Sequence, residues 1–282
     1  MAYMRRVSKL FLETPKYFRL SLCATSHGWV NLSPFYYSSI DFTLHRTEQI
    51  GNSTYVLSIK QDKSILQVNI LPKICLTHCR ILEERIRRAL SFDFSINDFI
   101  KYSSKLSKEI NSAVLKGYSY FLRSFTPFED AVKTLITTNC SWGYTKNISH
   151  SLCLHLGKKA FDDTYSFPSL KRLKDLTEID FRRLGLGYRS NYLVSLCHNF
   201  LLSKSTPQNW LGFGNYASAH FSFLCGSFEQ VPVDREVCRY LKIPYNSQSF
   251  VKVNSLYSDW GPYKFLAYKI ERRLRKENWI GF

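Results

Sequence analysis

The chain has 282 residues, of which 45% are hydrophobic and 16% aromatic. That length and composition allow one large domain or two smaller ones with real cores, and they exclude a disordered chain. Lys and Arg number 39 against 22 Asp and Glu, a formal net charge of +17. This excess favours nucleic acid as a partner over the alternatives, which are a ribosome-associated protein and a protein that binds anionic membranes.

Cysteine use and the N-terminal residues indicate the compartment. The eight cysteines are scattered and lie mostly in apolar surroundings, and residues 1–6 lack the apolar core and cleavage site of a signal peptide. We therefore expect reduced thiols in a protein that is cytoplasmic (in the bacterial nucleoid) or nuclear, and not secreted. Cys75 and Cys79 predict a helix start and not half of a zinc site, because no second pair follows. We expect no metal, no cofactor and no membrane span.

Residues 14–71 are predicted to be rich in β-strands. Stretches with strand character lie at 17–23, 42–46, 55–59 and 65–70, and turns are expected at 51–52 and 61–63. An antiparallel meander is the simplest topology for such consecutive strands. We therefore predict an N-terminal antiparallel β lobe over residues 1–75.

From residue 76 onward the spacing of apolar residues becomes helical. Thr126 followed by Pro127 and two acidic residues is typical of a helix start. Helices are predicted at about 76–90, from 95, from 126, and at about 142–156, 168–175, 188–202, 213–225, 235–242, 247–257 and 262–277. The predicted fold class is α+β, with the small β lobe followed by a mainly helical region over residues 76–282.

A glycine turn precedes one of these helices. Gly212 and Gly214 flank Phe213 directly before an apolar stretch. Such a turn presents backbone N–H groups, and the N-terminus of the helix behind it attracts phosphate. Alone, the pattern is a weak signal, since many helices begin after similar turns.

An acidic residue follows at the start of the next predicted helix. Asp234 comes directly after the segment 231–233 (Val-Pro-Val). Taken alone it predicts a helix N-cap, which stabilises a helix by about 1 kcal/mol. Together with the glycine turn it also indicates a carboxylate held beside bound DNA.

Four blocks of residues, in this order, resemble the helix-hairpin-helix-GPD superfamily of DNA glycosylases, in its 3-methyladenine DNA glycosylase II and 8-oxoguanine DNA glycosylase branches. The blocks lie at 125–142, 184–190, 211–217 and 231–234. The segment 26–29 (Ser-His-Gly-Trp) and the stretch after it are similar to the extra N-terminal lobe of those branches. The resemblance implies that residues 76–282 form the helix-hairpin-helix glycosylase region with the active-site cleft.

The resemblance also implies a mechanism. Asp234 matches the catalytic aspartate, whose carboxylate stabilises the oxocarbenium-like sugar and activates water. Bifunctional members carry a lysine nucleophile at the position that Tyr216 occupies here, so no Schiff base is expected. Two departures stand out. Trp210 and Leu211 replace the usual Leu-Pro of the hairpin, and no cysteine quartet follows Asp234, so an iron–sulfur cluster is not expected.

Contacts with flipped-out DNA follow from the same resemblance. Gly212, Phe213 and Gly214 would bind the backbone, and Tyr188 would act as a wedge. Arg189 would contact the base left unpaired, and Asn139 would fill the gap. The alternatives are a packing aromatic for Tyr188, a solvated charge for Arg189 and a turn residue for Asn139. Basic helix faces at 171–174, 182–183 and 272–276 would neutralise phosphates.

The flipped base needs an aromatic pocket. Aromatic side chains are more often core than pocket, and Tyr216 is the favoured exception because it follows the hairpin. The candidates for the pocket are Trp210, Tyr216, Phe221, Tyr257 and Trp260. Electron-deficient alkylated purines stack well on such rings.

We therefore predict a monomeric, monofunctional DNA N-glycosylase of base excision repair. It would flip a damaged, alkylated purine out of double-stranded DNA and hydrolyse its N-glycosidic bond with water assisted by Asp234. One alternative is a weak or inactive glycosylase-like protein that binds damaged or bent DNA. Another is an 8-oxoguanine-type enzyme without the lysine. A nucleic-acid-binding protein of unrelated fold would leave the ordered blocks unexplained.

Overall fold

The computed structural model describes residues 7–202 and 207–280, so residues 1–6, for which the sequence predicts no signal peptide, lie outside it. The chain forms two compact units. Unit 1 comprises Met1–Asp93 and Tyr120–Lys204, and unit 2 comprises Phe94–Ser119 and Ser205–Phe282. The sequence predicts that the β lobe ends at residue 75 and that the helical region begins at 76. In the structure the last strand ends at Leu71 and the first long helix begins at Leu76. As a boundary between domains, residue 75 stays a prediction.

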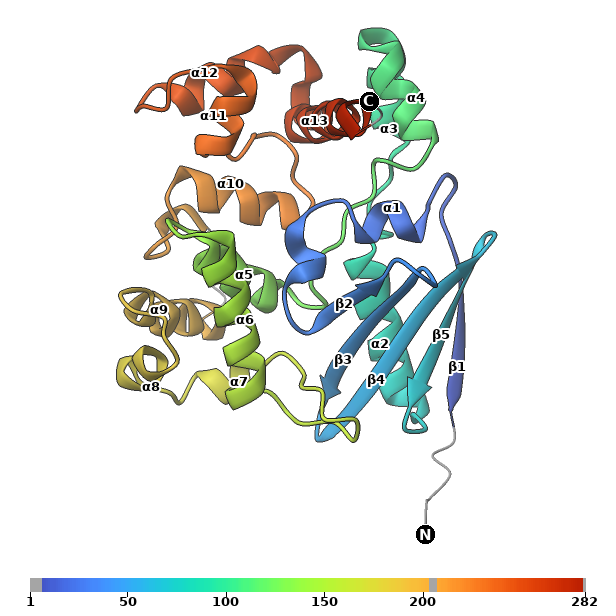
Figure 1. Cartoon of the computed structure of the whole chain (residues 1–282), viewed down its shortest axis with the longest axis vertical. Coiled ribbons are helices and arrows are strands. Elements are labelled where there is room, and N and C mark those ends of the chain that lie inside the picture. The colour runs from blue at the N-terminus through green and yellow to red at the C-terminus, as the bar shows by residue number, and fades with distance from the viewer. Residues whose placement is uncertain (1–6, 203–206, 281–282) are drawn as a thin grey trace. The chain divides into compact units, whose positions relative to one another are not determined.

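Unit 1 contains a five-stranded antiparallel sheet in the order β1-β5-β4-β3-β2 (Figure 1). Its strands are β1 Ser8–Glu13, β2 Phe35–Ser38, β3 Thr43–Ile50, β4 Ser53–Asp62 and β5 Ile65–Leu71. Strands β3, β4 and β5 are the predicted strands at 42–46, 55–59 and 65–70, and they form the predicted antiparallel meander. Two strands were not predicted from the sequence: β2, which pairs with β3, and β1, which pairs with β5. Gly51 and Lys63, both with positive φ, lie in the two predicted turns.

The prediction of a strand over 17–23 is wrong. Tyr17 has a φ of 68°, which interrupts an extended chain. The residues after it form the short helix α1, Leu20–Ala24, and bury Leu20, Cys23 and Ala24. The alternation of apolar residues suits a strand, but burial of these three side chains favours one helical turn.

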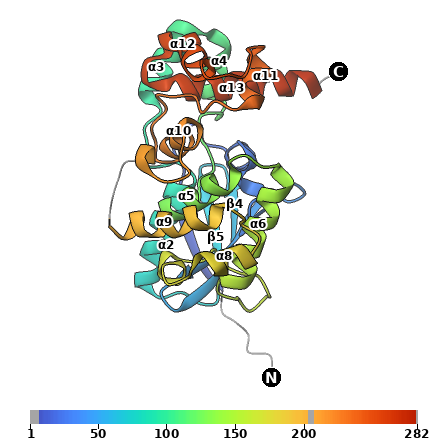
Figure 2. The same cartoon turned by 90° about the vertical axis from the view of Figure 1, so that its left-hand side faces the viewer.

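Helices cover one face of the sheet. Cross-strand pairs such as Leu57–Ile70 and Ile59–Val68 put buried apolar side chains on this face. Helix α2, Leu76–Ala89, packs against β3 and buries Leu82. The other long helices of unit 1 are α5 Pro127–Thr137, α6 Trp142–Leu156 and α9 Arg189–Leu201, with the short α7 Leu170–Leu173 and α8 Glu178–Arg183 (Figure 2).

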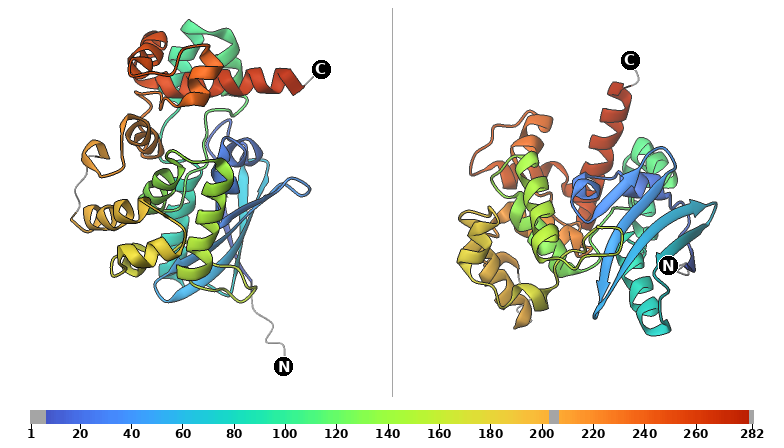
Figure 3. Two further views of the ribbon diagram at one scale, coloured as in Figure 1. Left: turned by 60° about the vertical axis from the view of Figure 1, so that its left-hand side comes forward. Right: turned by 60° about the horizontal axis from the view of Figure 1, so that its bottom comes forward.

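Unit 2 is helical. Helix α13, Lys264–Ile280, packs against α4, Lys108–Leu115 (Figure 3). The 3-10 helix η3, Ser258–Tyr263, packs against α13 and against α3, Asn97–Leu106. The helices of unit 2 are α3 Asn97–Leu106, α4 Lys108–Leu115, α10 Asn215–Leu224, α11 Arg235–Leu241, α12 Ser249–Leu256 and α13 Lys264–Ile280, with the 3-10 helices η2 Pro207–Asn209 and η3 Ser258–Tyr263. The helices predicted from 213 onward are confirmed to within three residues at each end.

Four cysteines are buried: Cys23, Cys153, Cys197 and Cys238. Burial raises the pKa of the Cys153 and Cys197 thiols to about 12, so these two stay protonated. Within 7–202 and 207–280 no cluster of three or more His, Cys, Asp or Glu residues is placed to hold a metal ion. The same residues include no helix with the length and apolar content that a membrane crossing requires.

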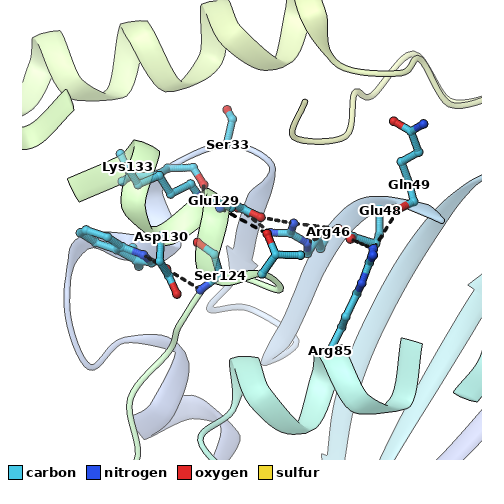
Figure 4. A network of polar contacts seen from close by, with 12 residues as sticks. Ser33, Arg46, Glu48, Gln49, Arg85, Ser124, Glu129, Asp130 and Lys133 are labelled. Atoms are coloured by element: carbon cyan, nitrogen blue, oxygen red, sulfur yellow. Dashed lines mark hydrogen bonds and ion pairs between the residues drawn. The ribbon is translucent and has the colours of Figure 1, made fainter. Parts of the chain in front are cut away.

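A buried ionic network joins the sheet of unit 1 to α5 (Figure 4). The guanidinium of Arg46, on β3, lies between two carboxylates, at 2.7 Å from Glu48 and 2.6 Å from Glu129 of α5. Lys133, one turn further along α5, lies 2.7 Å from Glu129 and has no exposed side-chain surface. Arg85 of α2 completes the network by pairing with Glu48.

The neighbouring residue of α5 forms a second anchor. Asp130 is fully buried and accepts hydrogen bonds from the indole N–H of Trp29 at 2.8 Å and from the backbone N–H of Ser124 at 2.9 Å. Its other carboxylate oxygen lies 2.8 Å from Arg88 of α2. Helix α5 is therefore fixed from two sides by charges on other elements.

The network keeps Glu129 ionised. Burial by itself would raise the pKa of this carboxyl, but Arg46 and Lys133 outweigh burial and lower the pKa to about 2. Removing the negative charge would leave two buried cations without their shared partner.

We predict that Glu129→Gln lowers the free energy of unfolding by about 3–5 kcal/mol, because uncompensated buried charge is costly. Urea unfolding followed by circular dichroism measures this. Glu83→Gln makes the same charge change in the surface pair with Arg87 and should cost less than about 1 kcal/mol. Equal losses in the two variants would contradict the role assigned to the network.

Candidate functional site

The predicted glycine turn opens helix α10 in unit 2. Gly212 has a φ of 85°, which a residue with a side chain adopts only under strain. Phe213 donates its N–H to the carbonyl of Trp210 at 3.0 Å, which closes the turn. Gly214 is the N-cap of α10, and a Cβ atom added there would meet nothing within 4 Å. An extended anion could therefore approach the backbone closely at this position.

An aromatic cluster holds the turn in place. The ring centroids of Trp210, Phe213 and Phe221 lie 5.3–6.0 Å apart, and all three side chains are buried. For Trp210 and Phe221 this packing favours the core alternative, and their place in a base pocket stays a prediction. The side chain of Phe213 supports the turn from inside, so a contact of this residue with DNA would come from its backbone.

Tyr216 lies in the first turn of α10, where it is half-buried. Its ring stacks on that of His220, with centroids 5.7 Å apart and an angle of 16° between the planes. Burial lowers the pKa of His220 to about 3, and the positive charge of Lys269 acts in the same direction. His220 is therefore neutral near pH 7, and the stacked pair forms an uncharged aromatic surface.

Asp234 is the N-cap of α11. Its Oδ1 accepts a hydrogen bond from the backbone N–H of Val237 at 2.7 Å, which fixes the carboxylate. The segment before it is held by Asn254 of α12, whose side chain accepts from the N–H of Val231 at 2.8 Å and donates to its carbonyl at 3.3 Å. The sequence predicts the cap but not Asn254, because an Asn inside a helix carries no signal for this contact.

The charge of Asp234 affects the pKa of Tyr268, a buried residue of α13. Burial raises the pKa of Tyr268 to about 12 against the opposing charge of Arg272, and Asp234 acts in the same direction as burial. Tyr257, a predicted pocket residue, is buried and donates to Glu271 at 2.8 Å. This hydrogen bond favours a structural role for Tyr257.

Trp260, the last pocket candidate, lies in η3 and is half-buried. Its ring lies 5.9 Å from that of Phe99 in α3. Of the five candidates, Tyr216 and Trp260 are therefore the two that keep exposed surface.

Unit 1 contains the three other predicted DNA contacts. Helix α5 ends at Thr137, and Asn139 follows with a φ of 48° and an exposed side chain. Asn tolerates this left-handed conformation better than most residues. Tyr188, just before α9, is 47% exposed, and its ring lies 5.6 Å from that of Tyr192, so its role as a wedge stays a prediction.

Arg189 is not a solvated charge. It is 4% exposed, and its guanidinium donates to the backbone carbonyls of Thr138 and Asn139, the latter at 3.1 Å. The guanidinium also lies over the rings of Tyr144 at 5.2 Å and Tyr188 at 4.5 Å. Arg189 therefore holds the Asn139 turn and Tyr188 together, and a direct contact with an unpaired base stays a prediction.

The two glycines of the block at 184–190 make it possible for Tyr188 and Arg189 to reach α6. Gly185 and Gly187 have φ values of 89° and 57°, which let the chain turn sharply between α8 and α9. The hydroxyl of Tyr144 donates to the carbonyl of Gly185 at 2.7 Å. The turn thus brings Arg189 and Tyr188 to the first turn of α6.

Solved structures that match this chain include DNA glycosylases. The 8-oxoguanine glycosylase/lyase of Clostridium acetobutylicum in its apo form matches with a TM-score of 0.71 at 15% identity, over 93% of this chain and 94% of that chain. Its complex with double-stranded DNA containing cytosine opposite 8-oxoguanine matches with a TM-score of 0.69 at 13% identity, over 96% and 98%. The 3-methyladenine DNA glycosylase of Archaeoglobus fulgidus gives 0.70 at 13% identity, over 93% and 97%.

Sequence similarity is shorter. A stretch of 61 residues is 36% identical to the N-glycosylase/DNA lyase OGG1 of Arabidopsis thaliana, which is 22% of this chain and 17% of that protein. No protein-family model matches the chain. The predicted fold class is confirmed: the chain has the α+β glycosylase fold, with an antiparallel sheet at the N-terminus followed by helices.

Because His220 has a pKa of about 3 in the folded chain and about 6.5 when unfolded, the unfolded chain takes up its proton first as the pH falls. We predict that lowering the pH from about 7.5 to about 5 costs the wild type about 2 kcal/mol of stability more than it costs His220→Gln. Urea unfolding at both pH values measures this difference. The control His155→Gln, at an exposed histidine of α6, should follow the wild type. Equal losses in wild type and His220→Gln would show that His220 is not held neutral by burial.

Proposed function

We propose that this protein is a monofunctional DNA N-glycosylase of base excision repair. The observation that carries the proposal is the carboxylate of Asp234, fixed at the start of α11 in a chain with the glycosylase fold. The hydrogen bond of the cap holds the carboxylate in a fixed position, and a carboxylate fixed beside the reacting sugar is what stabilisation of a cationic sugar requires. The same contact thus serves the helix and the chemistry.

The proposed reaction is hydrolysis of the bond between the base and C1′. As this bond breaks, its electron pair leaves with the base, and positive charge builds on the sugar. Asp234 would stabilise that charge and accept a proton from the water that attacks C1′. The base takes up a proton as it leaves, and the products are the free base and an abasic site.

Tyr216 carries the proposal that water, and not the protein, is the nucleophile. A phenol at this position cannot form a Schiff base, which requires an amine. The plant relative is named as a glycosylase and lyase, and lyase chemistry of that kind would need an amine at the sugar. We therefore propose base release without strand incision.

DNA would be bound through backbone and charge. The turn at Gly212 and Gly214, as the hairpin of a helix-hairpin-helix motif, would place N–H groups and the N-terminus of α10 on a phosphate. The net charge of +17 would add strongly salt-dependent binding. We propose a monomer on double-stranded DNA, in the bacterial nucleoid or the nucleus.

Flipping the damaged base out of the duplex leaves a gap and an unpaired base. Asn139 would fill the gap because its side chain is exposed on a turn that Arg189 holds in place. Tyr188 would act as the wedge, with Arg189 stacked against its ring. Arg189 would then act chiefly by positioning these two residues.

The substrate we propose is a damaged purine, with alkylated purines first. The uncharged stack of Tyr216 on His220 offers a flat π surface that would attract an electron-deficient ring. Oxidised purines are the alternative, since the structural relatives include both 8-oxoguanine and 3-methyladenine enzymes.

We predict that Asp234→Asn lowers base release by roughly 10²- to 10⁴-fold while the fold survives, because Asn caps a helix as well as Asp does. The assay uses duplexes that each contain one alkylated, oxidised or deaminated purine, treated with alkali after incubation. Asp98→Asn, in the first turn of α3, is the matched control and should retain full activity. Full base release by Asp234→Asn would refute the catalytic assignment. Tight binding without release from any lesion by the wild type would favour the DNA-binding alternative.

We further predict that strand cleavage depends entirely on the added alkali. Borohydride, which reduces a Schiff base to a stable adduct, should trap no complex between the wild type and DNA. Tyr216→Lys restores an amine at this position, and any trapped adduct should appear only in this variant. An adduct with the wild type would show that another amine attacks the sugar.

A further inference from the structure

Trp142 is a large aromatic side chain at the surface of unit 1. It is the first residue of α6, lies three residues after Asn139 and is 40% exposed. None of the roles proposed so far uses it. An indole left open to water costs hydrophobic free energy, so its position needs a cause.

The ring of Trp142 rests directly on the α-carbon of Gly28. A Cβ atom at Gly28 would lie 2.5 Å from Cζ2 and 2.7 Å from Cη2 of the indole, closer than any real contact. Only glycine therefore leaves room for the ring. This part of the indole is covered by backbone, and the exposed remainder faces solvent.

The support beneath the ring is rigid. On one side of Gly28, the imidazole of His27 hydrogen-bonds the carbonyl of Leu122 at 2.7 Å. On the other side, Trp29 donates to the buried Asp130 at 2.8 Å. The short 3-10 helix η1, Gly28–Asn31, is thereby fixed to α5. The backbone on which the indole rests is thus fixed by hydrogen bonds on both sides of Gly28.

The surroundings of Trp142 suit nucleic acid. Two residues along α6, Tyr144 stacks on the Arg189 guanidinium, which also contacts Tyr188 and the Asn139 carbonyl. The first turns of α6 and α9 therefore form one surface with exposed aromatic rings and a polar gap-filling residue. Such rings bind bases through their π faces, independently of sequence.

We propose that Trp142 stacks on a nucleobase of DNA that has left the helical stack. The base is either the damaged base or the partner that it leaves behind, and both present the same flat π face. The inference rests on the proposed function for the presence of such a base. Gly28 is the matching positioning residue, because its missing side chain makes the seat for the indole.

Gly28→Ala tests the seat without touching the ring. The φ of Gly28 lies outside the left-handed region, so the backbone accepts alanine. The new methyl group would push the indole from its place. Gly28→Ala should therefore weaken DNA binding as Trp142→Ala does, and it should have no further effect in the Trp142→Ala background.

The experiment uses 2-aminopurine, whose emission falls when an aromatic ring stacks on it. One duplex has it opposite a tetrahydrofuran abasic analogue, and the other has it in a mismatch, in place of the damaged base. Wild type should quench the probe in one of the two, and this identifies the base. Trp142→Ala should abolish this quenching and raise Kd about 5- to 150-fold, and Trp142→Phe should restore part of both.

Phe11→Ala is the control, because Phe11 is also an exposed aromatic residue, at 59%, but lies on the edge strand β1. It should leave quenching and Kd unchanged. If wild type binds the duplexes and Trp142→Ala shows the same Kd and the same quenching as wild type, the stacking role of Trp142 is refuted. The proposed function would still stand. If wild type binds neither duplex, the proposed function and the inference both fail.

Discussion

The pairing of Arg46 with two carboxylates, buried between the sheet and α5, is the constraint on which unit 1 depends. A guanidinium on the inner face of β3 is unfavourable unless Glu48 and Glu129 meet it with correct geometry. That requirement sets the position of α5 along and across the sheet. Asp130 adds a second attachment, to η1 and α2. Because α5 ends two residues before Asn139, the anchored helix also determines where the side chain of Asn139 lies.

In the candidate DNA surface of unit 1, glycine positions in the backbone decide where the larger side chains lie. Gly185 and Gly187 let the chain turn so that Arg189 reaches the carbonyls of the Asn139 turn, and Gly28 provides the seat for Trp142. The sequence leaves Arg189 open to interpretation as a solvated surface charge. In the structure it is buried, and it holds the turn at Asn139 through hydrogen bonds. One nitrogen, Nη2, donates to both carbonyls, and the flat guanidinium also lies over the rings of Tyr144 and Tyr188, a contact that suits a planar arginine better than a lysine.

Asp234 caps α11 with a single oxygen, so the cap and the proposed catalytic role are compatible and not alternatives. Asn254, from a different helix, fixes the backbone just before it. The aromatic cluster of Trp210, Phe213 and Phe221 supports the glycine turn from inside. The carboxylate and the turn are thus held independently of each other.

Local chemistry in the sequence determined the strands from β3 to β5, the helix starts at Thr126 and Asp234, and the glycine turn, because alternation, caps and positive φ depend on neighbouring residues. Tertiary structure decided the rest. Residues 17–23 alternate like a strand, yet the chain forms the helix α1 from Leu20 onward and buries Leu20, Cys23 and Ala24 on it. Arg189, Asn254 and Gly28 act through partners 50, 23 and 114 residues away. Contacts at such separations leave no periodic or local signal, so only the folded chain reveals them.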